Sequence, residues 1–126
     1  MRFVVPSVLC AVALIHLLPL VGVWSAARVA SLYGIAVQDP NLELLLRHRA
    51  VLFGLLAAFL AVAAFQRPLH GWALAAGGVS VGAFLLLALT VGPINGALAT
   101  VVKVDWVALA LLAVGTWVHL RSSGPG

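Results

Sequence analysis

Residues 72–91 read WALAAGGVSVGAFLLLALTV and carry no charged side chain. A helix of this length covers about 30 Å at 1.5 Å per residue, which matches the hydrocarbon thickness of a bilayer. A helix in water normally keeps one polar face, so a surface that is apolar on all sides is typical of a helix in lipid. We therefore predict that residues 72–91 span a membrane.

Three further stretches of the 126-residue chain have the same character. The breaks between them contain Pro and Gly, as in Gln66–Gly71 and Gly92–Gly96, which is typical of tight reversals between helices. We predict an all-α integral membrane fold, a single domain over residues 1–121 built as a bundle of four transmembrane helices. The helices are expected at 3–24, 42–65, 72–91 and 98–118, and residues 122–126 are expected to form a disordered tail.

The composition excludes a water-soluble fold. Hydrophobic residues make up 64% of the chain and charged residues 8%, and the mean hydropathy is +1.21. The net charge of +4 comes from 7 Lys and Arg against 3 Asp and Glu. These charges are scattered singly, so no nucleic-acid partner is expected. Cys10 is the only cysteine, which excludes a disulfide within the chain and a Cys-rich metal site.

The N-terminal segment imitates a secretory signal, with Arg2 before an apolar run and small residues at 25–27 after it. The run covers 22 residues, 3–24, and is therefore longer than the ~7–15 residues of a signal core. It matches the length of a bilayer span. We expect it to be retained as the first helix.

The basic residues outside the apolar segments predict an orientation. Arg2, Arg67 and Arg121 share one side, and the opposite side offers Arg28. Because Lys and Arg are enriched in cytoplasmic loops, we expect both termini in the cytoplasm. Four tryptophans lie near segment ends, as interfacial anchors do: Trp24, Trp72, Trp106 and Trp117.

Small residues predict where helices meet. Gly78 and Gly82 lie four residues apart on the third segment, and Gly77 and Ser80 belong to the same small-residue surface. Gly54 and Ala58 repeat the spacing of four on the second segment. Such strips let a neighbouring backbone approach closely, within the bundle or in a homo-oligomer. The third segment has no charge and is otherwise expected to be scaffold.

Helix length draws charged residues into the bilayer. From 106 to 119 there are 14 residues, about 21 Å, so the fourth helix must begin earlier and bring in Lys103 and Asp105. From 50 to 65 there are 16 residues, about 24 Å, which draws Arg47, His48 and Arg49 to the outer rim. Arg47 and Arg49 are about 200° apart around the helix, so one should face headgroups and the other the interior.

A polar pocket in the outer half of the bundle follows from these depths. His16 lies eight residues before Trp24, about 12 Å beneath the same surface. Intramembrane ionisable residues usually face a partner or a cavity. As catalytic candidates we take His16, Arg47, His48, Arg49 and Asp105; as ligand-binding candidates, Tyr33, Glu43, Asn95 and Lys103; no metal ligands are assigned. The alternative is structural: Glu43–Arg47 and Asp105 with an arginine form internal ion pairs, and His16 is a satisfied core residue.

Four short motifs are spread over nearly the whole chain: Ile15-His16-Leu17-Leu18-Pro19, Leu32-Tyr33-Gly34, Leu44-Leu45-Leu46-Arg47-His48-Arg49-Ala50 with Phe53-Gly54, and Val104-Asp105. They resemble small bacterial four-helix membrane proteins that often carry the label phosphopantetheine adenylyltransferase, and the Arg-His-Arg stretch is the most specific part. Adenylyltransferases of that kind are soluble α/β enzymes with a His-x-Gly-His motif, which is absent here. Nucleotidyltransferase activity is therefore not expected.

More distantly, the layout is similar to DoxX-like four-helix membrane proteins, with a long first outer loop and an arginine-bearing second helix. That group includes quinone-linked oxidoreductase subunits and anthrone-oxygenase-like enzymes. The resemblance implies redox or oxygenation chemistry on a hydrophobic substrate.

Three classes of function remain open on the sequence. The first is a protein of the lipid bilayer that binds or transforms a small lipophilic molecule with an anionic or enolisable head, with a quinone among the candidates. The second is a non-catalytic accessory subunit or assembly factor of a larger membrane complex. The third is electron transfer through haem b, with His16 and His48 as axial ligands. His70 and His119 form a similar pair on the cytoplasmic side, at the interface and not within the membrane.

Overall fold

The computed structural model describes residues 2–18, 26–36 and 38–122. Over these residues every regular element is a helix and there is no strand, which confirms the all-α prediction. The elements are α1 (Val4–Leu17), α2 (Ala26–Tyr33), α3 (Pro40–Ala64), the 3₁₀ turn η2 (Arg67–Leu69), α4 (His70–Val91) and α5 (Gly96–Ser122).

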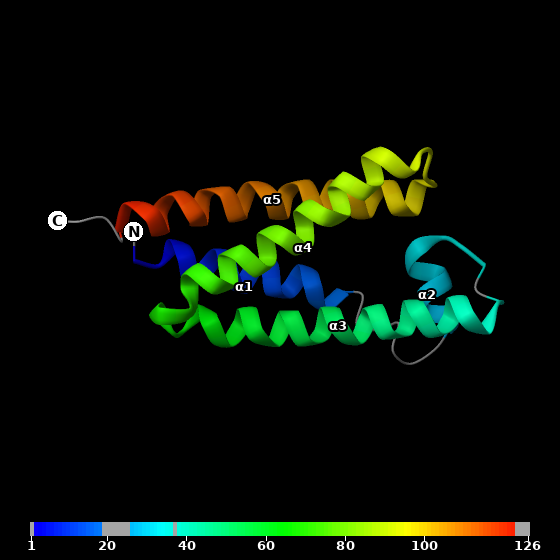
Figure 1. Ribbon diagram of the computed structural model, residues 1–126, viewed down its shortest axis with the longest axis horizontal. Coiled ribbons are helices and arrows are strands. Elements are labelled where there is room, and N and C mark those ends of the chain that lie inside the picture. Colours follow the sequence, from blue (N-terminus) through cyan, green and yellow to red (C-terminus); the bar gives the residue numbers. More distant parts are fainter. Residues whose placement is uncertain (1, 19–25, 37, 123–126) are drawn as a thin grey trace.

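The four longer helices form a bundle (Figure 1). The central helix α1 packs against both α3 and α5, and α4 crosses the bundle at an angle and packs mainly on α5. The short α2 lies beside the start of α3, at the opposite end of the bundle from the start of α1 and the end of α5. The bundle therefore has a terminal end, where η2 also lies, and an α2 end.

Three of the described helices are long and apolar enough to cross a membrane: α3, α4 together with η2, and α5. The fourth, α1, is apolar but has 14 residues, and residues 19–24 of the span expected at 3–24 lie outside the described residues. Trp24 and residues 123–126 of the expected tail lie outside them as well.

The observed helices extend beyond the expected apolar segments. The helix α3 begins at Pro40 because the Asp39 carboxylate accepts the Asn41 backbone N–H at 2.9 Å and caps the helix. The helix α5 runs from Gly96 to Ser122 and so includes Ser122, which was expected to belong to the disordered tail. Hydrophobicity marks the part of a helix that suits lipid, whereas helical hydrogen bonding continues through polar residues on either side.

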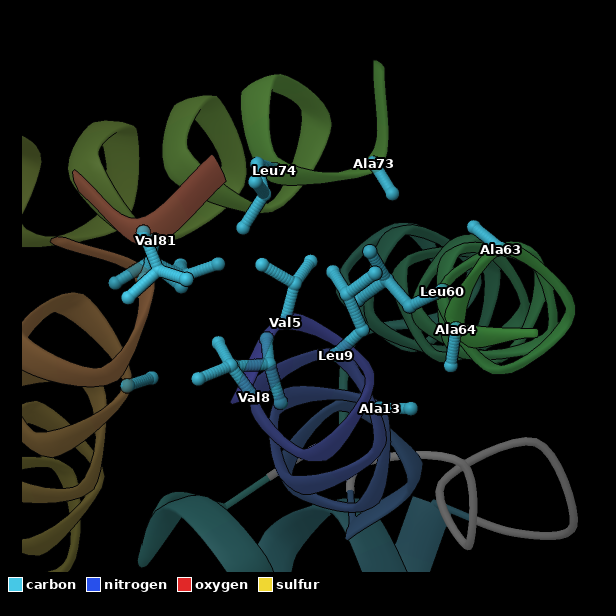
Figure 2. Close-up of a cluster of buried hydrophobic side chains, with 14 of the residues drawn as sticks. Val5, Val8, Leu9, Ala13, Leu60, Ala63, Ala64, Ala73, Leu74 and Val81 are labelled. Carbon is cyan, nitrogen blue, oxygen red and sulfur yellow. The ribbon is translucent and has the colours of Figure 1, made fainter. Parts of the chain in front are cut away.

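The core lies between α1 and its neighbours. Figure 2 shows Val5, Val8 and Leu9 of α1 between Leu60 of α3 and Leu74 of α4. Close approach to α5 depends on the absence of a side chain at position 115. A Cβ there would lie 3.1 Å from Val8 Cγ1 and 3.2 Å from Leu74 Cδ2.

The small residues of α4 differ in how closely their neighbours approach. A Cβ at Gly77 would lie 3.2 Å from Leu112 Cδ2, so Gly77 allows the close approach to α5 that is expected of a small-residue strip. A Cβ at Gly78 or Gly82 would meet nothing within 4 Å, so these two glycines make no such contact with the described residues. Large apolar side chains cover the outside of the bundle elsewhere, including Leu55, Trp72 and Val79.

Candidate functional site

A cavity of about 320 Å³ opens between α1, α2, α3 and α5. We call it the Arg49 cavity. Its polar lining comes mainly from His16, Tyr33, Arg49 and Asp105, since the hydroxyl of Thr100 is bonded to the Gly96 carbonyl of its own helix at 3.1 Å. The rest of its wall is mainly apolar: Ile15, Leu18, Phe53, Ala97, Thr100, Val101 and Val104. A mainly apolar cavity with a few convergent polar groups is the usual form of a small-molecule site.

Arg49 is held by aromatic rings. Its Nε donates a hydrogen bond to the Tyr33 hydroxyl at 3.2 Å. Its Cζ lies 4.3 Å from the ring centroid of Phe53, 5.5 Å from that of Phe84 and 5.8 Å from that of Tyr33. Ring faces attract a guanidinium without neutralising its charge. Arg49 is therefore fixed in place and remains a cation.

Tyr33 reaches the cavity because the chain reverses directly after it. It is the last residue of α2 and is buried. Gly34 follows with φ +65°, a conformation that glycine adopts without steric cost. Asn95 secures the reversal, since its Nδ2 donates to the carbonyls of Tyr33 at 2.9 Å and Gly34 at 3.1 Å. Its Oδ1 accepts the Leu98 backbone N–H at 2.8 Å, so Asn95 positions Tyr33 and does not line the cavity.

The Tyr33 hydroxyl keeps a free donor. It accepts the hydrogen bond from Arg49 through a lone pair. A phenol can donate and accept at once, and none of the described side chains or carbonyls accepts this O–H. The O–H is therefore available to a group bound in the cavity.

His16 is a fixed wall of the cavity. It is 3% exposed, and its Nδ1 lies 2.9 Å from the Val12 carbonyl. A carbonyl only accepts, so Nδ1 carries a proton. Nε2 lies 3.1 Å from Ser80 Oγ on α4, and in the neutral ring it accepts the hydrogen bond from this hydroxyl. The ring also contacts Phe53, with centroids 5.3 Å apart. The interpretation of His16 as a satisfied core residue therefore fits its hydrogen bonds, although one side of the ring lines the cavity.

Asp105 and Arg49 line the same cavity without touching. Both side chains are half-buried. Among the described residues, the one ion pair between Lys or Arg and Asp or Glu joins Glu43 to Arg47 at 3.2 Å, as the i,i+4 spacing predicted. The alternative in which Asp105 closes an ion pair with an arginine is thus not observed. The Asp105 carboxyl group and the Arg49 guanidinium are therefore separated within one mainly apolar cavity.

Arg49 and Tyr33 also form part of a second cavity. This space, of about 290 Å³, lies between α3, α4 and the start of α5 and includes Phe84, Leu87 and Leu98 in its lining. Two adjacent apolar cavities therefore share the hydrogen-bonded Arg49–Tyr33 pair as a wall.

The other candidates lie elsewhere. Glu43, Arg47 and His48 line a separate surface depression on the outer side of α3, and Lys103 is exposed and lines none of these spaces. Of the two arginines, Arg49 faces the interior and Arg47 the exterior, in agreement with the angle between them. The structure thus brings together His16, Tyr33, Arg49 and Asp105. The other five candidates do not line the cavity: Glu43, Arg47, His48, Asn95 and Lys103.

Residues 72–91, which were expected to be scaffold, do not line the Arg49 cavity but support two of its side chains. Ser80 of α4 holds His16, and Phe84 of α4 packs on Arg49. Prediction from charged residues missed the Ser80 hydroxyl, which bonds to His16, and the Phe84 ring, on which the Arg49 guanidinium packs. The spacing of Phe53, four residues after Arg49 on one helix, did offer a signal for a contact.

The histidines bear on the haem hypothesis. Because His16 has both ring nitrogens engaged and His48 lines the outer depression, no cavity of the described residues brings these two together. His70 and His119 do meet, with ring centroids 6.4 Å apart, at the terminal end. The described residues contain no group of three His, Cys, Asp or Glu side chains arranged to hold a metal ion.

Comparison of the chain with known protein families, characterised proteins and solved structures finds no match. A functional interpretation therefore rests on the geometry described above.

Proposed function

We propose that this chain is a membrane protein that binds a small lipophilic molecule in the Arg49 cavity, with the anionic or enolisable head of the ligand between Arg49 and Asp105. The observation that carries this proposal is the pair of opposite charges that line one apolar cavity without forming an ion pair. Burying two separated charges costs free energy that an ion pair or a bound polar group would recover. A ligand head between them supplies that group.

The roles of the residues follow from their hydrogen-bonding capacity. The Arg49 guanidinium and the Tyr33 O–H donate to the head oxygen of the ligand. The Asp105 carboxylate accepts a proton from an enolisable C–H or an O–H of the same head. The electron pair left behind is delocalised onto the carbonyl oxygen in an enolate, or stays on the oxygen in a phenolate. Arg49 stabilises the negative charge on that oxygen. The apolar wall, with Phe53, Val101 and Val104, takes the body of the molecule.

The location proposed is a bacterial inner membrane, with both termini in the cytoplasm. Support comes from the three long apolar helices and from Arg2 and Arg67, which lie together at the terminal end. The Arg49 cavity, toward the α2 end, then belongs to the outer half of the bundle.

The test compares a charged with a neutral probe of the same shape. The full chain in lipid nanodiscs is titrated with 2-naphthoate and, separately, with 2-naphthamide, and binding is followed by calorimetry. Loss of a charge-assisted hydrogen bond to the ligand weakens the free energy of binding by about 1.5–3 kcal/mol. Arg49→Gln should therefore weaken naphthoate binding by roughly 10- to 100-fold and change naphthamide binding by much less.

The matched control is Arg47→Gln, which removes the same charge from the same helix outside the cavity. Arg47→Gln should leave naphthoate binding within about twofold, because a half-exposed charge near the surface is screened. Equal losses in the two variants would mean that general charge, and not the cavity, attracts the anion. Wild-type affinity in Arg49→Gln would also refute the proposal.

A second candidate, an accessory subunit of a membrane complex, is favoured by one observation. Gly78 and Gly82 present an open small-residue face on the outside of α4. Small residues four apart allow another helix to approach closely in lipid. If the chain acts through this face, Gly82→Leu should disrupt co-purification of an intact complex while naphthoate binding by the Arg49 cavity persists.

A further inference from the structure

A second polar cavity lies at the terminal end of the bundle. It has a volume of about 490 Å³ and contains no residue of the Arg49 cavity. Arg2, Arg67, His70 and His119 line it from four different elements, the segment before α1, η2, α4 and α5. Phe3 and Phe65 give it an apolar side. We call it the terminal cavity.

The charge around this cavity has one sign. The three acidic side chains of the sequence are Asp39, Glu43 and Asp105. The first two lie at the start of α3, at the α2 end, and Asp105 is 14 residues before His119, about 21 Å along α5. The general excess of basic residues on the cytoplasmic side explains why arginines lie at this end. It does not explain why basic groups from four elements converge on one cavity.

The side chains that line the terminal cavity carry hydrogen-bonding groups and charges that are available to a ligand. The exposed side chain of Arg67 makes no hydrogen bond or ion pair with another described residue. His70 Nε2 lies 3.2 Å from the Ala64 carbonyl, which fixes that ring and leaves its Nδ1 without a hydrogen-bond partner in the described part of the chain. His119 lies against the backbone of α4, where a Cβ at Gly71 would be 3.2 Å from its Nε2. Arg2 contacts the Phe3 ring, 4.9 Å from its Cζ, and keeps its charge.

From this arrangement we infer that the terminal cavity binds the phosphate of an anionic phospholipid headgroup. Guanidinium groups match phosphate oxygens in geometry and charge, and basic pockets between helices at the membrane surface suit lipid headgroups. Phe3 and Phe65 lie where the first carbons of the acyl chains would pack. The inference is independent of the function proposed for the Arg49 cavity, since the two sites share no residue.

The test measures the first lipid bound to the full chain in neutral detergent micelles by native mass spectrometry. The probes are phosphatidylglycerol, phosphatidylcholine with the same acyl chains, and inorganic phosphate as a competitor. Wild-type protein should bind phosphatidylglycerol about tenfold more tightly than phosphatidylcholine. Arg67→Gln and Arg2→Gln should each weaken phosphatidylglycerol binding by about tenfold, the loss of one charge-assisted contact. Both positions are exposed, so these variants open no core cavity.

Arg121→Gln is the control. Arg121 lies in the last turn of α5, two residues after His119, but it does not line the cavity. Its Cζ lies 5.0 Å from the ring centroid of Trp117. Its loss should change binding by less than about twofold. Equal affinity for the two lipids in the wild type, or an equal loss in Arg121→Gln, would overturn the inference. If inorganic phosphate binds as tightly as the lipid and displaces it, the cavity takes free phosphate, which overturns the lipid assignment.

Discussion

The hydrogen bond between His16 and Ser80 allows a quantitative test of the described packing. The Ser80 hydroxyl is the α4 partner of a histidine that is 3% exposed. Ser80→Ala removes one oxygen and leaves His16 Nε2 buried without a partner. An unsatisfied buried group costs about 1–3 kcal/mol in soluble proteins, but hydrogen bonds between membrane helices average about 0.6 kcal/mol and reach about 1.7. We expect Ser80→Ala to lower the free energy of unfolding by about 0.6–1.7 kcal/mol.

The reverse change and the double variant isolate the bond. His16→Leu replaces the ring by an apolar side chain and leaves Ser80, whose hydroxyl can turn to a carbonyl of its own helix. In the double variant neither group is left unsatisfied. Its free energy of unfolding should therefore exceed the value expected from adding the two single effects by about 0.6–1.7 kcal/mol.

The assay is equilibrium unfolding in mixed micelles of a mild and a denaturing detergent, followed by helical circular dichroism. Ser7→Ala is the control, because Ser7 is an exposed hydroxyl on α1 and its loss should cost less than about 0.5 kcal/mol. A coupling energy below about 0.3 kcal/mol would refute the reasoning, since sites without a shared contact behave additively to that level. It would mean that α4 does not hold His16 in the tautomer described.

Three further predictions concern single substitutions, measured by the same unfolding assay and, for Asn95, by naphthoate binding as well. Gly115→Ala should lower the free energy of unfolding by about 1–3 kcal/mol, because the new Cβ would press on Val8. Gly82→Ala, where the new Cβ meets nothing, should change it by less than about 0.5 kcal/mol. Similar values for the two variants would contradict the described α1–α5 contact. Asn95→Ala should cost about 1–2 kcal/mol and weaken naphthoate binding through Tyr33, and unaltered binding would show that Tyr33 needs no support. Glu43→Gln should change the free energy of unfolding by no more than about 0.5 kcal/mol, since its ion pair is partly exposed, and a loss of several kcal/mol would contradict this.

Much of the architecture could be predicted from residue type and length. The apolar run at 72–91 corresponds to α4, and the helical class follows because backbone groups in lipid must be paired within the chain. Length also predicted that Arg49 and Asp105 enter apolar surroundings, where both are half-buried. Helix ends were predicted less well, because Asp39 and Ser122 lie beyond the apolar segments and are governed by local hydrogen bonds.

The membership of the site could not be predicted in the same way. Sequence spacing showed that Arg47 and Arg49 diverge, but it did not show which of them faces the interior. A soluble helix reveals its inner face by amphipathic periodicity. The helices α3 and α5 are apolar on nearly all sides, with exposed leucines and valines such as Leu55 and Val107, so that signal is absent.

The sequence by itself determined that the chain is helical, that it suits a membrane, and how far along each helix its polar residues lie. Only the tertiary structure decided which of them converge, placing His16, Tyr33, Arg49 and Asp105 around one cavity and Glu43, Arg47 and His48 outside it. The physical reason is that hydrophobic length fixes position along a helix axis. Rotation about that axis is fixed by close packing, for example where Gly115 meets Val8, and no pattern within one helix contains that contact.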